Sequence, residues 1–111
     1  MYYIKKTMEV SAAHFLDLPY DSPCTNTHGH NFKICIYCKS EELDQNGMVI
    51  DFKNIKNLVD KKLDHKFLNE EVKFNPTSEN LAKWLCDLIP HCYRVDIEEN
   101  ENNWATYEVD E

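Results

Sequence analysis

Two histidines separated by a single residue, His28 and His30, constrain the fold of this chain more than any other feature. Side chains alternate between the two faces of an extended chain, so both imidazoles share a face if residues 28–30 lie in a strand. Two imidazoles on one face can bind one metal ion together. Cys24 precedes the pair by four residues, where a turn could fold its thiol back over that metal. The stretch 24–32 therefore predicts a metal site with a thiol beside it.

Alternating apolar and polar residues predict strands on both sides of this stretch and again near the end of the chain. Residues 2–13 and 30–39 have the alternation of two strands that pair as a hairpin. Residues 48–50, which follow an Asn-Gly turn, form a short extended piece. Residues 93–98 and 104–109 alternate again and predict a terminal hairpin.

Two amphipathic helices are predicted between the strand pairs. Asp51 is the expected N-cap of the first helix, which ends near Asp64 and His65. Thr77 or Ser78 caps the second helix, whose leucines recur at helical spacing before Pro90. The resulting order, β-β-α-α-β-β, predicts an α+β fold with an antiparallel sheet. The length predicts a single domain, residues 1–111.

Charge and cysteine content exclude several classes of function. The formal net charge is -8, and residues 96–111 contain seven Asp or Glu and no Lys or Arg, which argues against a nucleic-acid surface. No apolar run approaches the length of a membrane span, and no secretory signal is visible at the start. The five cysteines cannot all pair. These features predict a cytoplasmic protein with reduced thiols and no membrane partner.

His14 is the natural third ligand for the pair at 28 and 30. It ends the first predicted strand, which should lie next to the second. Three neutral imidazoles leave Zn²⁺ one open position, as in catalytic zinc sites. The alternative is that all three are ordinary surface or core histidines. Cys35 and Cys38 form a CxxC, but strand residues three apart point to opposite faces, so we interpret them as packing residues.

Other candidate residues have two readings when taken from the sequence alone. Cys24 lies in a predicted loop beside the predicted metal site, and a nearby cation favours a reactive thiolate that could act as a base. Asp64 and His65 could form a relay for that thiol, or simply end a helix. Of Glu98 and Glu99, one should face inward, where a ligand edge with two parallel N–H donors would suit it.

Six segments, in this order and at this spacing, resemble the 6-pyruvoyl-tetrahydropterin synthase family, and among its members the bacterial-type 6-carboxy-5,6,7,8-tetrahydropterin synthases of queuosine biosynthesis. They run nearly end to end and are Ser11-Ala12-Ala13-His14, Cys24-x-x-x-His28-Gly29-His30-Asn31, Gly47-Met48-Val49-Ile50-Asp51-Phe52, Leu63-Asp64-His65-x-x-Leu68-Asn69, Asn75-Pro76-Thr77-Ser78-Glu79-Asn80, and the hairpin from Glu99 to Trp104. The resemblance implies a T-fold, with a four-stranded antiparallel sheet and two helices on one face. It also implies a homo-oligomer, as a trimer or a dimer of trimers.

The resemblance assigns a role to each candidate residue. His14, His28 and His30 would bind zinc, and Cys24 would be the catalytic thiolate with Asp64 and His65 as its partners, which could come from a neighbouring subunit. Glu99, rather than Glu98, would hold the 2-amino and ring N–H edge of the pterin. Thr77 and Ser78 would help to seat the ring.

The implied reaction converts 7,8-dihydroneopterin triphosphate to 6-carboxy-5,6,7,8-tetrahydropterin with release of acetaldehyde and triphosphate. A 6-pyruvoyl-tetrahydropterin synthase, acting on the same substrate, is the alternative enzyme. A non-catalytic zinc-stabilised oligomeric module is the alternative from another class. Phe15 departs from the family pattern, in which many members carry Arg, and Lys33, Lys39, Lys66 or a neighbouring chain would have to contact the triphosphate.

Overall fold

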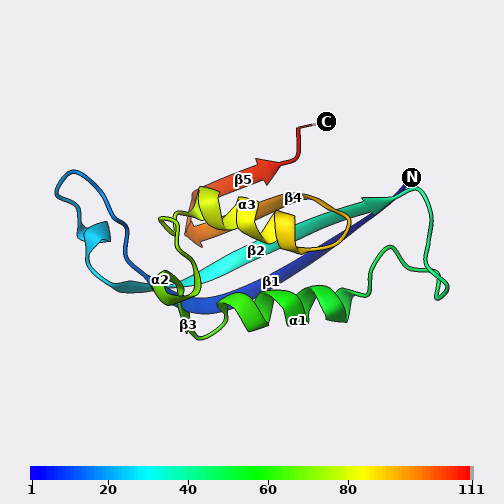
Figure 1. Cartoon of the computed structure of the whole chain (residues 1–111), viewed down its shortest axis with the longest axis horizontal. Coiled ribbons are helices and arrows are strands. Elements are labelled where there is room, and N and C mark those ends of the chain that lie inside the picture. Colours follow the sequence, from blue (N-terminus) through cyan, green and yellow to red (C-terminus); the bar gives the residue numbers. More distant parts are fainter. Residues whose placement is uncertain (111) are drawn as a thin grey trace.

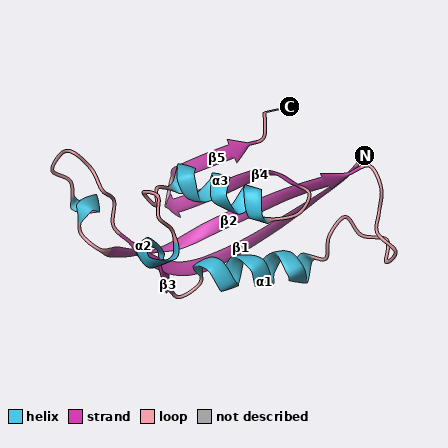
Figure 2. Ribbon diagram, in the orientation of Figure 1, coloured by secondary structure: helices cyan, strands magenta, loops and turns pink. Residues whose placement is uncertain are grey.

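The computed structural model describes residues 1–110 of the chain and contains one mixed sheet with helices against it (Figure 1). Figure 2 shows α1 and α3 lying along the same face of the sheet. The elements in chain order are β1 (Tyr2–His14), a 3-10 turn (Pro23–Thr25), β2 (His28–Ser40), α1 (Phe52–Leu63), β3 (Lys66–Phe67), α2 (Leu68–Glu71), α3 (Ser78–Leu88), β4 (Cys92–Asn100) and β5 (Asn103–Glu108).

The sheet has the strand order β3-β1-β2-β4-β5. The strands β1 and β2 form the predicted antiparallel hairpin, in register from Tyr2 opposite Ser40 to His14 opposite His28. The strand β4 pairs antiparallel with both β2 and β5, and the latter pair is the predicted terminal hairpin.

The expectation of a four-stranded, wholly antiparallel sheet with two helices was wrong. The sheet has five strands, because β3 adds a short parallel pairing at the edge of β1, and the described residues contain three α-helices. The cause is the way α1 ends. His65 takes a left-handed backbone conformation with φ 56°, and its N–H donates to the Ser11 carbonyl at 2.7 Å. The chain therefore turns alongside β1 for two residues before α2 begins.

The predicted helix starts are confirmed at both long helices. The Asp51 side chain accepts a hydrogen bond from the Lys53 N–H, and the Thr77 side chain accepts one from the Asn80 N–H. The second long helix, α3, ends at its C-cap Ile89, directly before Pro90. Residues 48–50, by contrast, form no strand, although Val49 is buried in the core.

The core lies between the helices and one face of the sheet. Inward residues of the strands alternate along β1 and β2 and meet the apolar stripes of α1 and α3; the fully buried members include Val10, Phe32, Ile34, Ile36, Ile55, Val59, Leu81, Leu85 and Ile97. Cys38 belongs to this core, whereas Cys35 contacts the Thr7 hydroxyl on the other face, as the strand geometry predicts. None of the helices in residues 1–110 is long and apolar enough to cross a membrane.

Candidate metal centre and active site

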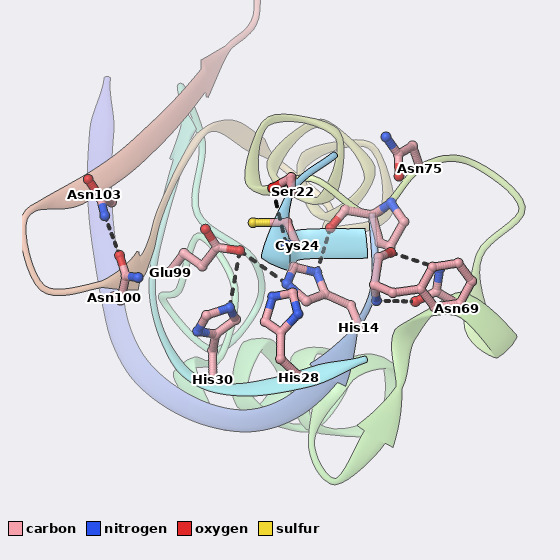
Figure 3. Close-up of polar contacts among 12 residues, drawn as sticks. His14, Ser22, Cys24, His28, His30, Asn69, Asn75, Glu99, Asn100 and Asn103 are labelled. Carbon is pink, nitrogen blue, oxygen red and sulfur yellow. Dashed lines mark hydrogen bonds and ion pairs between the residues drawn. The ribbon is translucent and has the colours of Figure 1, made fainter. Parts of the chain in front are cut away.

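Strand pairing brings three histidine rings together at one end of the β1–β2 hairpin. His14 lies directly opposite His28, and His30 follows two residues later on the same face. The centroid of the His14 ring is 4.6 Å from that of His28 and 5.2 Å from that of His30. The centroids of the His28 and His30 rings are 4.7 Å apart. The three imidazoles predicted from their spacing therefore converge on one point (Figure 3).

Backbone carbonyls fix the orientation of two of these rings. The Nδ1 of His14 lies 2.8 Å from the carbonyl oxygen of Pro76, and the Nδ1 of His28 lies 2.7 Å from that of Asn26. A carbonyl oxygen only accepts, so each Nδ1 must carry the proton. In the neutral ring the lone pair is then on Nε2. Metal-binding histidines commonly have this arrangement, with one nitrogen held by the protein and the other free for the ion.

Glu99 is the fourth member of the cluster and comes from β4. The pairing of β4 with β5 shifts register between Glu98 and Asn100, which leaves Glu99 as a bulged residue without a partner on β5. Its carboxylate lies 3.1 Å from Nε2 of His14 and 3.4 Å from Nε2 of His30. The neighbouring Glu98 instead approaches Lys33, with 3.7 Å between carboxylate and ammonium. Of the two candidate glutamates, Glu99 thus faces the histidines.

The chemistry of this cluster fits a bound cation. The Nε2 of neutral His14 and the carboxylate of Glu99 are both acceptors, so their 3.1 Å approach requires either a protonated ring or a positive ion between them. Burial lowers the pKa of His30, although the Glu99 carboxylate acts in the opposite direction. A hydrogen bond from the His14 side chain, which the protonated ring can supply, is the main cause that lowers the pKa of Glu99 and favours its ionised form.

The Nε2 atoms of His14 and His30 are buried without a hydrogen-bond partner of adequate geometry. One potential ligand atom from each of the three histidines and from Glu99 lies within 4.8 Å of the others. Three imidazole nitrogens and a carboxylate oxygen form a donor set suited to zinc. The residues therefore fit a metal ion, which would give both unpartnered nitrogens a partner.

Cys24 approaches the cluster from the loop between β1 and β2. It lies in the 3-10 turn that Ser22 caps, and its N–H donates to the Ser22 hydroxyl at 3.2 Å. In Figure 3 its sulfur points toward Glu99. The thiol is partly buried and is not among the four groups that converge as ligands in the described residues. The thiol therefore lies outside the set of potential metal ligands.

Asp64 and His65 lie away from the histidine cluster of their own chain. The Asp64 carboxylate accepts from the Ser11 N–H at 3.1 Å, and the His65 Nε2 is 3.6 Å from the Asp64 carboxylate. Ser11 precedes His14 by three residues along β1, about 10 Å of extended chain, and is adjacent to Ala12, which lies opposite His30. The His65 side chain is 83% exposed. The two residues thus contact each other, and neither is among the groups that converge in the cluster of their own chain.

Thr77 and Ser78 lie at the start of α3, next to the proline that orients His14. The Thr77 side chain is engaged as the N-cap of the helix. The Ser78 hydroxyl is buried and has no hydrogen-bond partner. Of these two residues, Ser78 therefore has the hydrogen-bonding capacity to receive a ligand.

Sequence reasoning missed three contributors to the site. The Pro76 carbonyl orients His14, and the side-chain amides of Asn69 and Asn75 hold the chain just after it. Every residue has a backbone carbonyl, so the residue type at position 76 could not predict that this carbonyl orients His14. The two asparagines occur in recognisable motifs, but the backbone groups that they bind are more than fifty residues away.

The comparisons with known proteins agree with this geometry. A family model described as 6-pyruvoyl tetrahydropterin synthase matches residues 3–110. The chain is 30% identical to the 6-carboxy-5,6,7,8-tetrahydropterin synthase of Bacillus subtilis strain 168, over 94% of this chain and 83% of that protein. It is 39% identical to a putative 6-carboxy-5,6,7,8-tetrahydropterin synthase of Archaeoglobus fulgidus, over 86% of this chain and 85% of that one.

Among solved structures, the 6-pyruvoyl tetrahydropterin synthase of Caenorhabditis elegans superimposes with a TM-score of 0.76 at 29% identity, covering 98% of this chain and 96% of that one. The family match spans nearly the whole chain, and the solved relative has the same α+β architecture. The chain belongs to the 6-pyruvoyl tetrahydropterin synthase family.

Proposed function

We propose that this chain is a zinc-dependent lyase that converts 7,8-dihydroneopterin triphosphate to 6-carboxy-5,6,7,8-tetrahydropterin, releasing acetaldehyde and triphosphate, in queuosine and related 7-deazapurine biosynthesis. Family membership supports a lyase of the tetrahydropterin synthase type, and relatives that align over most of the chain are named for this reaction. The single observation that supports the zinc requirement is the convergence of three imidazoles, two of them oriented by backbone carbonyls, with Glu99. The reaction needs such a centre beside a proton-transfer group.

The metal would be held by His14, His28 and His30. When bound, zinc supplies a Lewis acid that polarises the side-chain hydroxyls of the substrate and acidifies the neighbouring C–H bond. Cys24 then acts on that acidified position, because its thiol lies on the loop that faces Glu99 and the rings. As a thiolate it takes the proton, and His65 with Asp64 relays it.

The pterin ring would be anchored by Glu99 rather than by the metal. A catalytic zinc site keeps one coordination position for the substrate, so three histidines suffice as its protein ligands. With the metal held by the three imidazoles alone, the ionised Glu99 carboxylate would accept two parallel N–H bonds from the 2-amino and ring N–H edge. The unpartnered Ser78 hydroxyl and the neighbouring Thr77 would contact the ring from the start of α3.

A second subunit would complete the site. Asp64 and His65 lie on the β1 edge of the sheet, apart from the histidines of their own chain. In residues 1–110, strand pairing on that edge of β1 covers only Ala12 and Ala13, and β5 is the other edge strand. Exposed edges of this kind can pair with another copy. We therefore propose a homo-oligomer, as a trimer or a dimer of trimers, in which these two residues act at a neighbour's metal.

Mixing two inactive variants tests this shared site. Cys24→Ala and His65→Ala proteins, unfolded together and refolded at equal amounts, should regain about a quarter of wild-type activity per site. The reason is that an intact Cys24 meets an intact His65 at one interface in four when subunits mix randomly. Mixing Cys24→Ala with Glu99→Gln, both from the same half of the site, should restore nothing. Failure of the first mixture to regain activity would contradict the shared site.

The product distinguishes the proposed reaction from its alternatives. Zinc-loaded protein incubated with dihydroneopterin triphosphate is expected to release acetaldehyde in step with 6-carboxy-tetrahydropterin, measured by chromatography. A pyruvoyl product without acetaldehyde would identify the chain as a 6-pyruvoyl-tetrahydropterin synthase, the name of the C. elegans relative. No turnover by a folded, zinc-loaded oligomer would contradict both enzymes and favour the non-catalytic module.

A further inference from the structure

The extended course of β1 continues past its last strand residue, His14, and an asparagine side chain takes the place of a neighbouring strand there. The Asn69 Oδ1 accepts from the Phe15 N–H at 2.9 Å, and the Asn69 Nδ2 donates to the Phe15 carbonyl at 3.0 Å. One amide group thus satisfies both polar backbone groups of one residue (Figure 3). A strand in a sheet satisfies its partner in the same way.

The same contact is repeated two residues later. The Asn75 Oδ1 accepts from the Asp17 N–H at 2.9 Å, and the Asn75 Nδ2 donates to the Asp17 carbonyl at 3.1 Å. Backbone groups of alternate residues in an extended chain point to the same edge. Asn69 and Asn75 therefore hold one edge of the segment 15–17, on the side where β3 borders β1.

The opposite edge of this segment is hydrogen-bonded to the turn that carries Cys24. The Leu16 N–H donates to the Cys24 carbonyl at 2.7 Å. Among the hydrogen bonds of the described residues, this is the only backbone bond that joins the start of the β1–β2 loop to the turn that carries Cys24. The segment 15–17 is thus fixed from both sides, between two asparagines and the thiol-bearing turn.

The backbone of Asn75 is itself held by hydrogen bonds. Its backbone carbonyl accepts from the Thr77 N–H at 2.8 Å and from the Asn80 Nδ2 at 2.9 Å, which anchors it to the start of α3. The next residue, Pro76, is the one whose carbonyl orients His14. The same short stretch therefore contacts both the metal ligand and the segment that follows it.

We propose that Asn69 and Asn75 are positioning residues that set the separation between the His14 imidazole and the Cys24 thiol. This inference rests on the proposed function, because only a metal and a thiol that act together need a fixed separation. Each amide uses both its oxygen and its nitrogen on the backbone of the segment 15–17. Both act through the backbone of the segment 15–17, and a misplacement of about 1 Å in a catalytic constellation can cost about 100-fold in rate.

The test replaces each amide by a side chain of similar size without hydrogen-bonding groups. Zinc- and Co²⁺-loaded Asn69→Leu and Asn75→Leu proteins are expected to bind metal stoichiometrically, with kcat lowered about 10- to 100-fold and KM changed much less. The d–d absorption bands of bound Co²⁺ should shift, and the rate of Cys24 alkylation by iodoacetamide, followed by mass spectrometry, should change. The last two measurements need no turnover.

Two controls separate positioning from a general loss of stability. Asn57→Leu replaces an exposed asparagine of α1 and should leave every measurement unchanged. Val59→Ala opens a cavity in the core away from the segment and should lower Tm without shifting the Co²⁺ bands. Equal spectral and alkylation changes in Val59→Ala at a matched loss of Tm would overturn the proposal.

Unchanged Co²⁺ bands and unchanged alkylation in both leucine variants would also overturn it. If those variants do not fold, Asn69→Asp and Asn75→Asp replace them, since each retains the acceptor for the backbone N–H and replaces the donor by a charged carboxylate oxygen that the backbone carbonyl repels. Smaller shifts in the same direction support the proposal, and wild-type values overturn it. Wild-type protein that binds metal but does not turn over would refute the proposed function alone, because the spectral and alkylation comparisons remain decisive.

Discussion

Replacement of Cys24 by alanine is expected to abolish nearly all turnover while leaving zinc content and Tm close to wild type. The thiol is proposed to move a proton at the position that the metal acidifies, and loss of a general base typically costs about 100- to 10,000-fold in kcat. The side chain is partly buried in a surface loop and is not among the converging ligand groups, so its loss should disturb neither core nor metal. Steady-state kinetics and metal analysis on the same preparation test both parts.

Cys92→Ala is the matched control for this experiment. It removes another partly buried thiol, at the start of β4, which donates to the Arg94 carbonyl at 3.5 Å and lies beside Cys38 and Cys86. Its kcat should stay close to wild type. A Cys24→Ala protein that retains most of its turnover would refute the thiolate role and leave the metal centre as the remaining source of catalysis.

The hairpin register and the helix caps are features that short-range patterns predict and that the structure confirms. Alternation along the two long strands places His14, His28 and His30 on one face, and a hairpin register is sufficient to bring them together. The caps at Asp51 and Thr77 depend only on neighbouring N–H groups, which makes them readable from local sequence.

The features that sequence reasoning missed depend on contacts between distant segments. The two-residue strand β3 is too short to show any periodicity, and it exists because His65 turns the chain against Ser11. Residues 48–50 have the composition of a strand, but in the structure only Val49 is used, as a core residue. Propensity is a weak guide where tertiary packing decides the conformation.

The position of Glu99 depends both on a local sequence pattern and on contacts between distant strands. Alternation along β4 predicts that one of two adjacent glutamates faces inward, without fixing which one. The register with β2 places Glu98 beside Lys33, and the bulge that follows turns the next carboxylate toward His14 and His30. The hydrogen bonds from Asn69 and Asn75 to the segment 15–17 could not be predicted either, because an asparagine in a sequence motif does not indicate which backbone groups it binds.

Replacement of His28 by alanine is expected to release the metal from an otherwise folded protein. Catalytic zinc needs three protein ligands, and loss of even an outer-sphere partner lowers metal affinity about 10- to 100-fold, so loss of a direct ligand should exceed that range. His28 is a sharper choice than His14. It is only partly buried, whereas the His14 side chain is 0% exposed and its removal would also leave the buried Pro76 carbonyl without its partner.

Metal analysis after dialysis, together with chelator competition, measures the effect. His91→Asn is the matched control, because it removes an exposed histidine outside the cluster at a position with φ 65°, which asparagine tolerates. That variant should keep its zinc. Full occupancy in His28→Ala would refute the ligand assignment. Loss of zinc with retained folding would separate catalytic from structural metal, because a zinc-stabilised module should unfold when its metal leaves.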